Sequence, residues 1–414
     1  MLEVNTRRTR SALTTIAIGG LALWSGIADA ANPQTPTASP AANLPVGPLI
    51  SLLEEPVGGL VAVPDAAGHV HVFAEKGKSI HHFSVAPDGS VEHDVVESSK
   101  SEPAPASLSA AFDASGRLNL IYGAQHWVRE DGGWHVGAAA RCSALVLAGS
   151  RFLCARQAKL GGTIVACTLF KPGSGCNPPR KIGIWREIAN EAWSDPLLID
   201  PDSAADLNTL ALDVDERGRG VLLYTRTDSD GAEIRRLTIE PGAADSTSSA
   251  APAGTDVALG RTRPWGGSCA AIDRTNGSML VITSQALGDG KYGPLEARLF
   301  TPGQAMPGQP IRVPERIMCD KRQGLAAASG GRWLAVFLGK RGLYHTPIAY
   351  RTLSQGTWSE PVALGDWYTY SIVPEDQESV YGFPLIVNNS SGLALVVWSS
   401  DRKALVARWA QAAP

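Results

Sequence analysis

The chain has 414 residues, with 37 Lys and Arg against 40 Asp and Glu, so its formal net charge is −3. Charged residues make up 19% and hydrophobic residues 44% of the chain, which is typical of a globular protein and excludes wholesale disorder. The near-neutral charge does not favour nucleic-acid binding, which normally requires a strongly basic surface. The 43 Gly and 28 Pro indicate many turns between short strands.

Residues 1–30 show the three parts of a secretory signal peptide. Three arginines within residues 7–10 precede an apolar run over residues 12–27, and small residues suit cleavage after Ala30. A membrane anchor is the alternative, but glycines break this run and no later run reaches the ~18 apolar residues of a membrane span. The paired arginines leave a twin-arginine route open beside the general secretory route. We therefore expect a periplasmic or extracellular protein without a membrane span in its mature chain.

Residues 31–48 are rich in Pro, Ala and Thr, which predicts a flexible leader. Residues 49–414 are predicted to form a single domain from one recurring unit: an apolar strand, a turn centred on Asp, Asn or Gly, and a second apolar strand. Its copies lie at 60–73, 108–122, 144–154, 210–224, 270–282, 325–337 and 385–398. Such repeats, each followed by one or two further strands, are typical of propeller blades.

The fold class that we predict is all-β: a seven-bladed β-propeller of four-stranded antiparallel blades. A six-bladed ring is an alternative because the third repeat is irregular, and a β-sandwich is another. The last repeat ends near Trp409 with only its third strand. We expect residues 46–53 to supply the outer strand of that blade, so that the N- and C-terminal segments close the ring and remove free sheet edges.

An even number of cysteines in an exported chain favours disulfides. The expected pairs are Cys142–Cys154, Cys167–Cys176 and Cys269–Cys319. A zinc site is the alternative, but the sequence has no CxxC pair and no histidine at ligand spacing from these cysteines. We therefore expect neither a metal nor a cofactor.

Two short motifs, Trp193-Ser-Asp-Pro196 and Trp358-Ser-Glu-Pro361, resemble the outer-strand ends of sialidase-type (BNR-like) propellers. The resemblance is loose, covers most of residues 48–414, and implies a propeller fold and glycan handling. Of the family's Asp-box, Ser-x-Asp-x-Gly-x-Thr-Trp, only the end is kept, in Ser354-Gln-Gly-Thr-Trp358. Val57-Gly-Gly-Leu60 replaces the Arg-Ile-Pro signature, so an arginine that holds the sialidase substrate is missing and sialidase activity is not implied.

In a propeller, the ends of the second strands and the beginnings of the first strands share one face, near the central channel. On this face the sequence places basic and aromatic residues, which suit a uronate: arginine holds a carboxylate in a two-point fork, and a basic funnel attracts anions. The alternative is that these cations are solvated or paired with nearby aspartates. The predicted substrate-binding residues are Arg156, Arg226, Arg322, Arg341, Lys340, Trp127, Trp265 and His82.

Histidine and tyrosine suit the base and acid of a β-elimination, because their protonation can be tuned. The predicted catalytic residues are His126, Tyr122, Tyr344 and His345. Glycoside hydrolysis of a sialidase-like type is an alternative that needs two carboxylates, available among Glu75, Asp228, Asp320 and Asp401. A non-catalytic glycan- or protein-binding propeller is the third hypothesis, because no sharp catalytic motif is present. We expect a monomer acting on an acidic poly- or oligosaccharide, with a polysaccharide lyase favoured.

Overall fold

The computed structural model divides the chain into two units, Met1–Asn43 and Leu44–Pro414, and every described residue belongs to the second. The predicted signal peptide and most of the leader therefore lie outside the described residues. The described residues are 46–55, 57, 59–76, 79–97, 108–112, 116–122, 125–136, 151–155, 164–169, 181–188, 192–193, 197–214, 219–229, 231–240, 255–262, 269–288, 291–302, 308–314, 316–317, 324–328, 330–338, 345–368, 384–389, 392–400 and 404–411.

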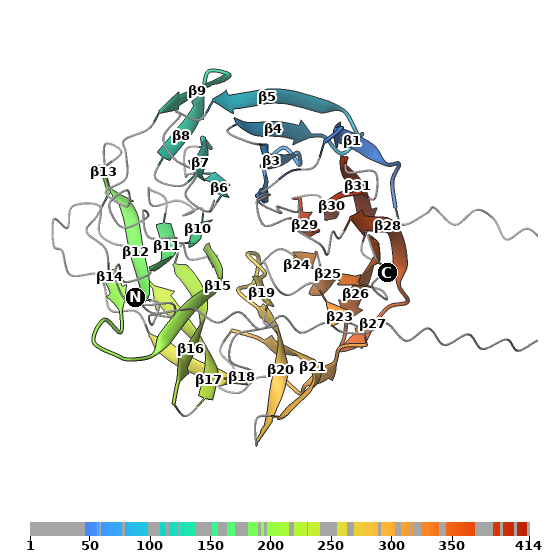
Figure 1. Ribbon diagram of the computed structural model, residues 1–414. Helices are drawn as coiled ribbons and strands as arrows, with labels where there is room; N and C mark the ends of the chain where they lie inside the picture. The colour runs from blue at the N-terminus through green and yellow to red at the C-terminus, as the bar shows by residue number, and fades with distance from the viewer. Residues whose placement is uncertain are drawn as a thin grey trace, which may run out of the picture. The chain divides into compact units, whose positions relative to one another are not determined.

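Within these ranges every regular element is a β-strand, and the strands form antiparallel sheets that follow one another in chain order (Figure 1). The β2–β5 sheet contains β2 (Leu60–Pro64), β3 (Val70–Lys76), β4 (Ser79–Val85) and β5 (Val91–Glu97). The β6–β9 sheet contains β6 (Leu108–Phe112), β7 (Leu118–Tyr122), β8 (Gln125–Glu130) and β9 (Gly133–Val136). The β10–β14 sheet contains β10 (Arg151–Ala155), β11 (Ile164–Leu169), β12 (Lys181–Ile188), β13 (Ala192–Trp193) and β14 (Leu197–Ile199).

The second half of the unit repeats this arrangement. The β15–β18 sheet contains β15 (Asp206–Val214), β16 (Gly220–Asp228), β17 (Gly231–Ile239) and β18 (Asp256–Thr262). The β19–β22 sheet contains β19 (Cys269–Ile272), β20 (Met279–Gly288), β21 (Lys291–Phe300) and β22 (Ile311–Arg312). The β23–β28 sheet contains β23 (Arg316–Ile317), β24 (Leu325–Ala328), β25 (Arg332–Leu338), β26 (His345–Ser354), β27 (Thr357–Trp358) and β28 (Val362–Tyr368).

The last sheet joins the two ends of the described chain. Its order is β1-β31-β30-β29, made of β1 (Ile50–Leu53), β29 (Leu385–Asn388), β30 (Leu393–Ser399) and β31 (Leu405–Gln411). The outermost strand, β1, pairs antiparallel with β31, with Ile50 opposite Ala407. Trp409 also donates a hydrogen bond of 2.8 Å from Nε1 to the carbonyl of Ala86. The N-terminal segment thus supplies the outer strand of this sheet, where the sequence placed it.

Turn chemistry explains why the first two strands of a repeat form a hairpin. In the β2–β3 turn, Asp65 Oδ1 accepts a hydrogen bond of 2.8 Å from the His69 amide, and Gly68 adopts φ +94°. In the β19–β20 turn, Asp273 Oδ1 accepts one of 2.9 Å from the Thr275 amide. Asp caps such turns through its side chain, and glycine adopts positive φ without strain.

The hydrophobic core lies between successive sheets. The first strands contact one another in chain order: β2 with β6, β6 with β10, β10 with β15, β15 with β19, β19 with β24, and β24 with β29, while β29 contacts β2. Small buried residues such as Ala110, Ala270 and Ala326 occupy these strands. Larger buried side chains, among them Phe73 and Trp127, pack between neighbouring sheets. This arrangement leaves the strand ends to carry polar groups.

The cysteine predictions fall largely outside the described residues. Cys269 is buried on β19, and its expected partner Cys319 is not among the described residues. The same holds for one member of each other expected pair, so all three disulfides stay predictions. None of the described residues forms a helix with the length and apolar character needed to cross a membrane.

Candidate functional site

A tyrosine and a glutamate meet where two neighbouring sheets end. Tyr122 is the last residue of β7, and its phenol donates a hydrogen bond of 2.5 Å to Glu75 Oε1. The other oxygen of Glu75, on β3, accepts a hydrogen bond of 3.1 Å from the Gly59 amide. Both side chains are half-buried. The fold therefore holds this pair in a fixed geometry at the border with solvent.

Strand register brings the pair together. The first residue of β2 lies opposite Ala74, and the first residue of β6 lies opposite Tyr122. Because β2 contacts β6, the ends of β3 and β7 lie close to each other. A Cβ at Gly59 would lie 3.0 Å from Glu75 Oε2, so a larger residue there would displace the Glu75 carboxylate slightly. The pair thus lies at the strand ends where the sequence predicted the ligand face.

The chemistry of the pair suits proton transfer. A phenol has one donor and two acceptor lone pairs, so Tyr122 can donate to Glu75 while its oxygen still accepts a proton from a ligand. A carboxylate placed behind such a phenol can take the phenol proton as the oxygen gains another. Tyr122 was a predicted catalytic residue, and Glu75 was one of four candidate carboxylates. No pattern in the sequence predicted that these two side chains contact each other.

Three other predicted site residues are enclosed in the core. His82 and His126 are 1% and 2% exposed. His82 Nδ1 lies 2.8 Å from Asp94 Oδ1, and His126 Nε2 lies 2.8 Å from Asn119 Oδ1. Trp127 is 4% exposed and packs between the β2–β5 and β6–β9 sheets. The sequence placed these residues at strand ends, but they point into the interior from within β4 and β8, so none is accessible to a glycan in this structure.

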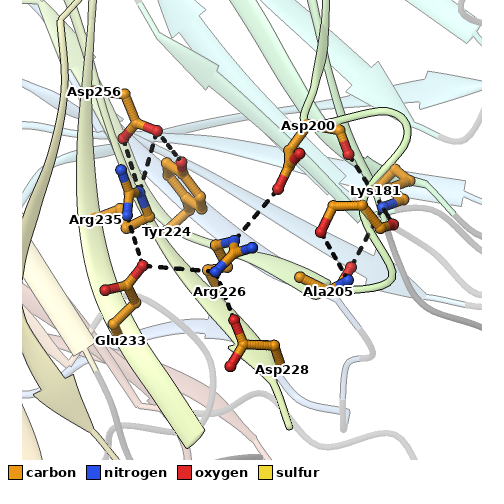
Figure 2. Close-up of polar contacts among 10 residues, drawn as sticks. Lys181, Asp200, Ala205, Tyr224, Arg226, Asp228, Glu233, Arg235 and Asp256 are labelled. Carbon is orange, nitrogen blue, oxygen red and sulfur yellow. Dashed lines mark hydrogen bonds and ion pairs between the residues drawn. The ribbon is translucent and has the colours of Figure 1, made fainter. Parts of the chain in front are cut away.

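Arg226 lies near the end of β16, as predicted, but other groups already hold its guanidinium (Figure 2). The nearest carboxylate oxygens belong to Asp228 at 2.5 Å, Asp200 at 3.3 Å and Glu233 at 4.0 Å. Three carboxylates thus compete with any substrate anion for this cation. Asp200 follows β14, so Arg226 links the ends of two neighbouring sheets. Lys181 fixes the loop after β14 by donating to the carbonyl groups of Asp200 and Ala205 at 3.1 and 3.4 Å.

A second tyrosine–carboxylate pair lies in the same network (Figure 2). The Tyr224 phenol donates a hydrogen bond of 2.8 Å to Asp256 Oδ2. Arg235 donates to both oxygens of Asp256 at 3.1 Å and to Glu233 at 2.6 Å. Burial, and then the bond to Asp256, raise the pKa of Tyr224 above its ordinary value. With Tyr224 only 1% exposed, this pair serves packing rather than ligand binding.

Of the remaining predicted site residues, His345 has its backbone among the described residues: it is the first residue of β26 and lies opposite Tyr368. The others lie outside the described residues: Tyr344, Arg156, Arg322, Arg341, Lys340 and Trp265. Their convergence on one cavity therefore stays a prediction. Among the described residues, no group of three or more His, Cys, Asp or Glu is arranged to hold a metal ion.

No protein-family model matches the chain, and its sequence has no significant match among curated proteins. Among solved structures, the polysaccharide lyase Uly1 has a TM-score of 0.52 at 9% identity, over 88% of this chain and 99% of Uly1. The chain has a propeller-like fold. An ulvan lyase of family PL25 has a TM-score of 0.41 at 10% identity, over 76% of this chain and 79% of that one. NanB sialidase from Streptococcus pneumoniae has a TM-score of 0.39 at 10% identity, over 91% and 72%.

The likeness in fold to Uly1 is consistent with the loose resemblance to sialidase-type propellers that the Trp-Ser-Asp/Glu-Pro motifs indicated. At such low identity the agreement concerns the fold. The chemistry depends on the side chains of this chain. Among the described residues, the Tyr122–Glu75 pair suits proton transfer.

Proposed function

We propose that this protein binds an acidic, uronate-containing glycan and cleaves it by β-elimination, with Tyr122 and Glu75 as the proton-handling pair. The observation that carries the proposal is the half-buried phenol at a strand end, hydrogen-bonded to a carboxylate of the neighbouring sheet. The propeller-like fold shared with a polysaccharide lyase supports it.

In the proposed step, the Tyr122 oxygen takes the proton from C5 of the uronate while the phenol proton moves to Glu75. The electron pair of the C5–H bond forms the C4–C5 double bond, and the C4–O bond breaks. The leaving oxygen takes a proton from water, and Glu75 returns its proton to solvent. The products are a new hydroxyl end and an unsaturated uronyl end.

Elimination also needs a cation that neutralises the uronate carboxylate, because the C5 proton is only weakly acidic beside a charged group. Arg226 is surrounded by carboxylates, which makes it a poor candidate. We assign this role to the predicted cations that follow other strands, namely Arg156, Arg322, Arg341 and Lys340, with Trp265 as a platform for a sugar ring. Tyr344 and His345 remain proposed as further acid–base groups near the same face.

The architecture that we infer is a closed seven-bladed β-propeller. Two observations support it: the first strands contact one another in chain order with β29 returning to β2, and β1 supplies the outer strand of the last sheet. We further propose that the protein is exported by the segment 1–30, acts as a monomer in the periplasm or outside the cell, and contains the three expected disulfides.

Glycoside hydrolysis is a second candidate, because Glu75 supplies one of the two carboxylates that it needs. A screen of acidic and neutral polysaccharides separates the hypotheses. Growth of the ultraviolet absorbance of an unsaturated uronate supports elimination, whereas reducing ends without that absorbance indicate hydrolysis. Binding of an acidic glycan without any product would leave a non-catalytic binding protein, and neither binding nor product with any acidic glycan would overturn the proposal.

A further inference from the structure

Four side chains form a polar chain across the β2–β5 sheet, which we call the imidazole chain: Asp65, His71, His82 and Asp94. His82 Nδ1 lies 2.8 Å from Asp94 Oδ1, and His82 Nε2 lies 2.9 Å from His71 Nδ1. His71 Nε2 lies 3.4 Å from Asp65 Oδ2. The two rings are nearly parallel, at 4°, and only 7% and 1% of His71 and His82 are exposed.

The partners of Asp94 determine where His82 carries its proton. The Asp94 carboxylate forms hydrogen bonds with His82 Nδ1, with the indole Nε1 of Trp134 at 3.1 Å, and with the guanidinium of Arg129 at 3.1 Å. Burial alone would raise the pKa of Asp94, but the bond from His82 and these other donors hold it below its usual range. An ionised carboxylate only accepts hydrogen bonds, so His82 donates from Nδ1.

The same reasoning then fixes His71. With a single ring proton, on Nδ1, His82 would accept at Nε2, and His71 would then donate to it from Nδ1. A neutral His71 has no second N–H, and its Nε2 therefore directs a lone pair at the Asp65 oxygen. This contact is the longest of the three, at 3.4 Å.

The Asp94 end of the imidazole chain contacts side chains of a second sheet. Asp94 is on β5, whereas Arg129 and Trp134 are on β8 and β9 of the next sheet. This interface also carries the Tyr122–Glu75 pair. The charged and titratable groups that face the imidazoles are Asp65, His69, Asp94 and Arg129, and the rings of Phe73, Phe112 and Trp134 cover them.

We propose that the imidazole chain is a proton-sensitive latch between the β2–β5 and β6–β9 sheets, closed while both histidines are neutral and loosened when His71 takes up a proton. A proton on His71 Nε2 creates a cation in a buried position beside His82 and Arg129. Within the imidazole chain, Asp65 alone gains a hydrogen bond from this new N–H. Water can hydrate this cation fully only if the interface opens, so acid favours the open form.

The sign of the pH dependence follows from burial. Burial first, and then His82, lower the pKa of His71 from 6.5 to about 4, against the opposing effect of Asp65. The folded chain therefore binds this proton more weakly than the unfolded chain does. The contribution of neutral His71 to stability is present above pH 6.5 and is lost as the pH falls from 6.5 towards 4.

The test compares His71→Asn with a matched control, His81→Asn. Asparagine keeps an N–H donor near the position of Nδ1 but does not titrate. His81 makes the same kind of contact, Nδ1 to His93 Nε2 at 3.1 Å, on the exposed side of the sheet. Burial and then His93 also lower its pKa, so this control shows what a more exposed histidine of the same sheet contributes. The thermal midpoint is measured for the full chain and both variants between about pH 7.5 and about pH 4.5.

We expect the unaltered protein and His81→Asn to lose roughly 5 °C or more over this range, and His71→Asn to lose less than half as much. An equal loss in His71→Asn would overturn the latch. Nitrogen NMR of the imidazole rings in the unaltered protein gives a second answer that needs no variant. At neutral pH it should show His71 and His82 protonated on Nδ1 and bare on Nε2, and a proton on His71 Nε2 would contradict the proposal. Neither measurement depends on the proposed glycan activity.

Discussion

The two tyrosine–carboxylate pairs of this protein have the same donor and acceptor but different surroundings. Tyr122 and Glu75 come from neighbouring sheets and are half-buried at a strand end. Tyr224 is 1% exposed and shares Asp256 with Arg235. The phenol–carboxylate bond itself therefore says little about function. Access of a ligand to the phenol oxygen distinguishes a candidate reactive group from a structural one.

The interfaces around these pairs differ in the same way. The interface of Tyr122 contains two buried imidazoles in contact with each other, and burial lowers the pKa of one of them, His71. The network around Tyr224 is held by guanidinium groups that stay charged, with Arg226 among three carboxylates. We therefore expect the first region to respond to mild acid and the second to salt.

The largest difference between the pairs should appear in turnover on an acidic glycan. Glu75→Gln keeps an oxygen that accepts the Tyr122 hydrogen bond but cannot take up the phenol proton. We expect the turnover rate to fall by roughly 10²-fold, with little change in glycan affinity. Asp256→Asn is the matched change in the second pair and should leave turnover within about twofold. Equal turnover in Glu75→Gln and the unaltered protein would remove Glu75 from the mechanism.

Stability should depend more on the imidazole chain than on the arginine network. Asp94→Ala leaves the buried His82 N–H without its acceptor, and removes one acceptor each from Trp134 and Arg129. We expect the free energy of unfolding to fall by about 1–3 kcal/mol, measured by urea denaturation at neutral pH. Asp88→Ala, at the exposed β4–β5 turn, is the control and should change it much less.

The smallest effect is expected from Arg226→Ala. Its ion pairs lie near the surface, with 30% of the side chain exposed, and such pairs contribute at most about 1 kcal/mol. The loss should shrink further when unfolding is repeated in high salt. A tenfold or greater loss of affinity for an acidic glycan would instead show that Arg226 leaves its carboxylates to bind the substrate.

Local sequence patterns were enough to predict the hairpins, because turn residues such as Asp65 and Gly68 act within a few positions of the chain. The pairing of β1 with β31 also followed, from an incomplete last repeat. The site was harder to predict. Placing His126 and Trp127 at a strand end required the first residue of β8 to be known within a position or two. Arg226 pairs with Asp200, a carboxylate that follows a strand of another sheet, and no periodicity in the sequence encodes such a contact.

The central claim is that Tyr122, and not a tyrosine in a similar hydrogen bond elsewhere, performs the acid–base chemistry. The most direct test is the rate of unsaturated-uronate formation from an acidic polysaccharide by Tyr122→Phe and Tyr224→Phe, measured beside the unaltered protein. Each change removes one hydroxyl and one hydrogen bond to a carboxylate. We predict a fall of about 10²–10⁴-fold for Tyr122→Phe and a rate close to that of the unaltered protein for Tyr224→Phe. Full activity in Tyr122→Phe would contradict the account.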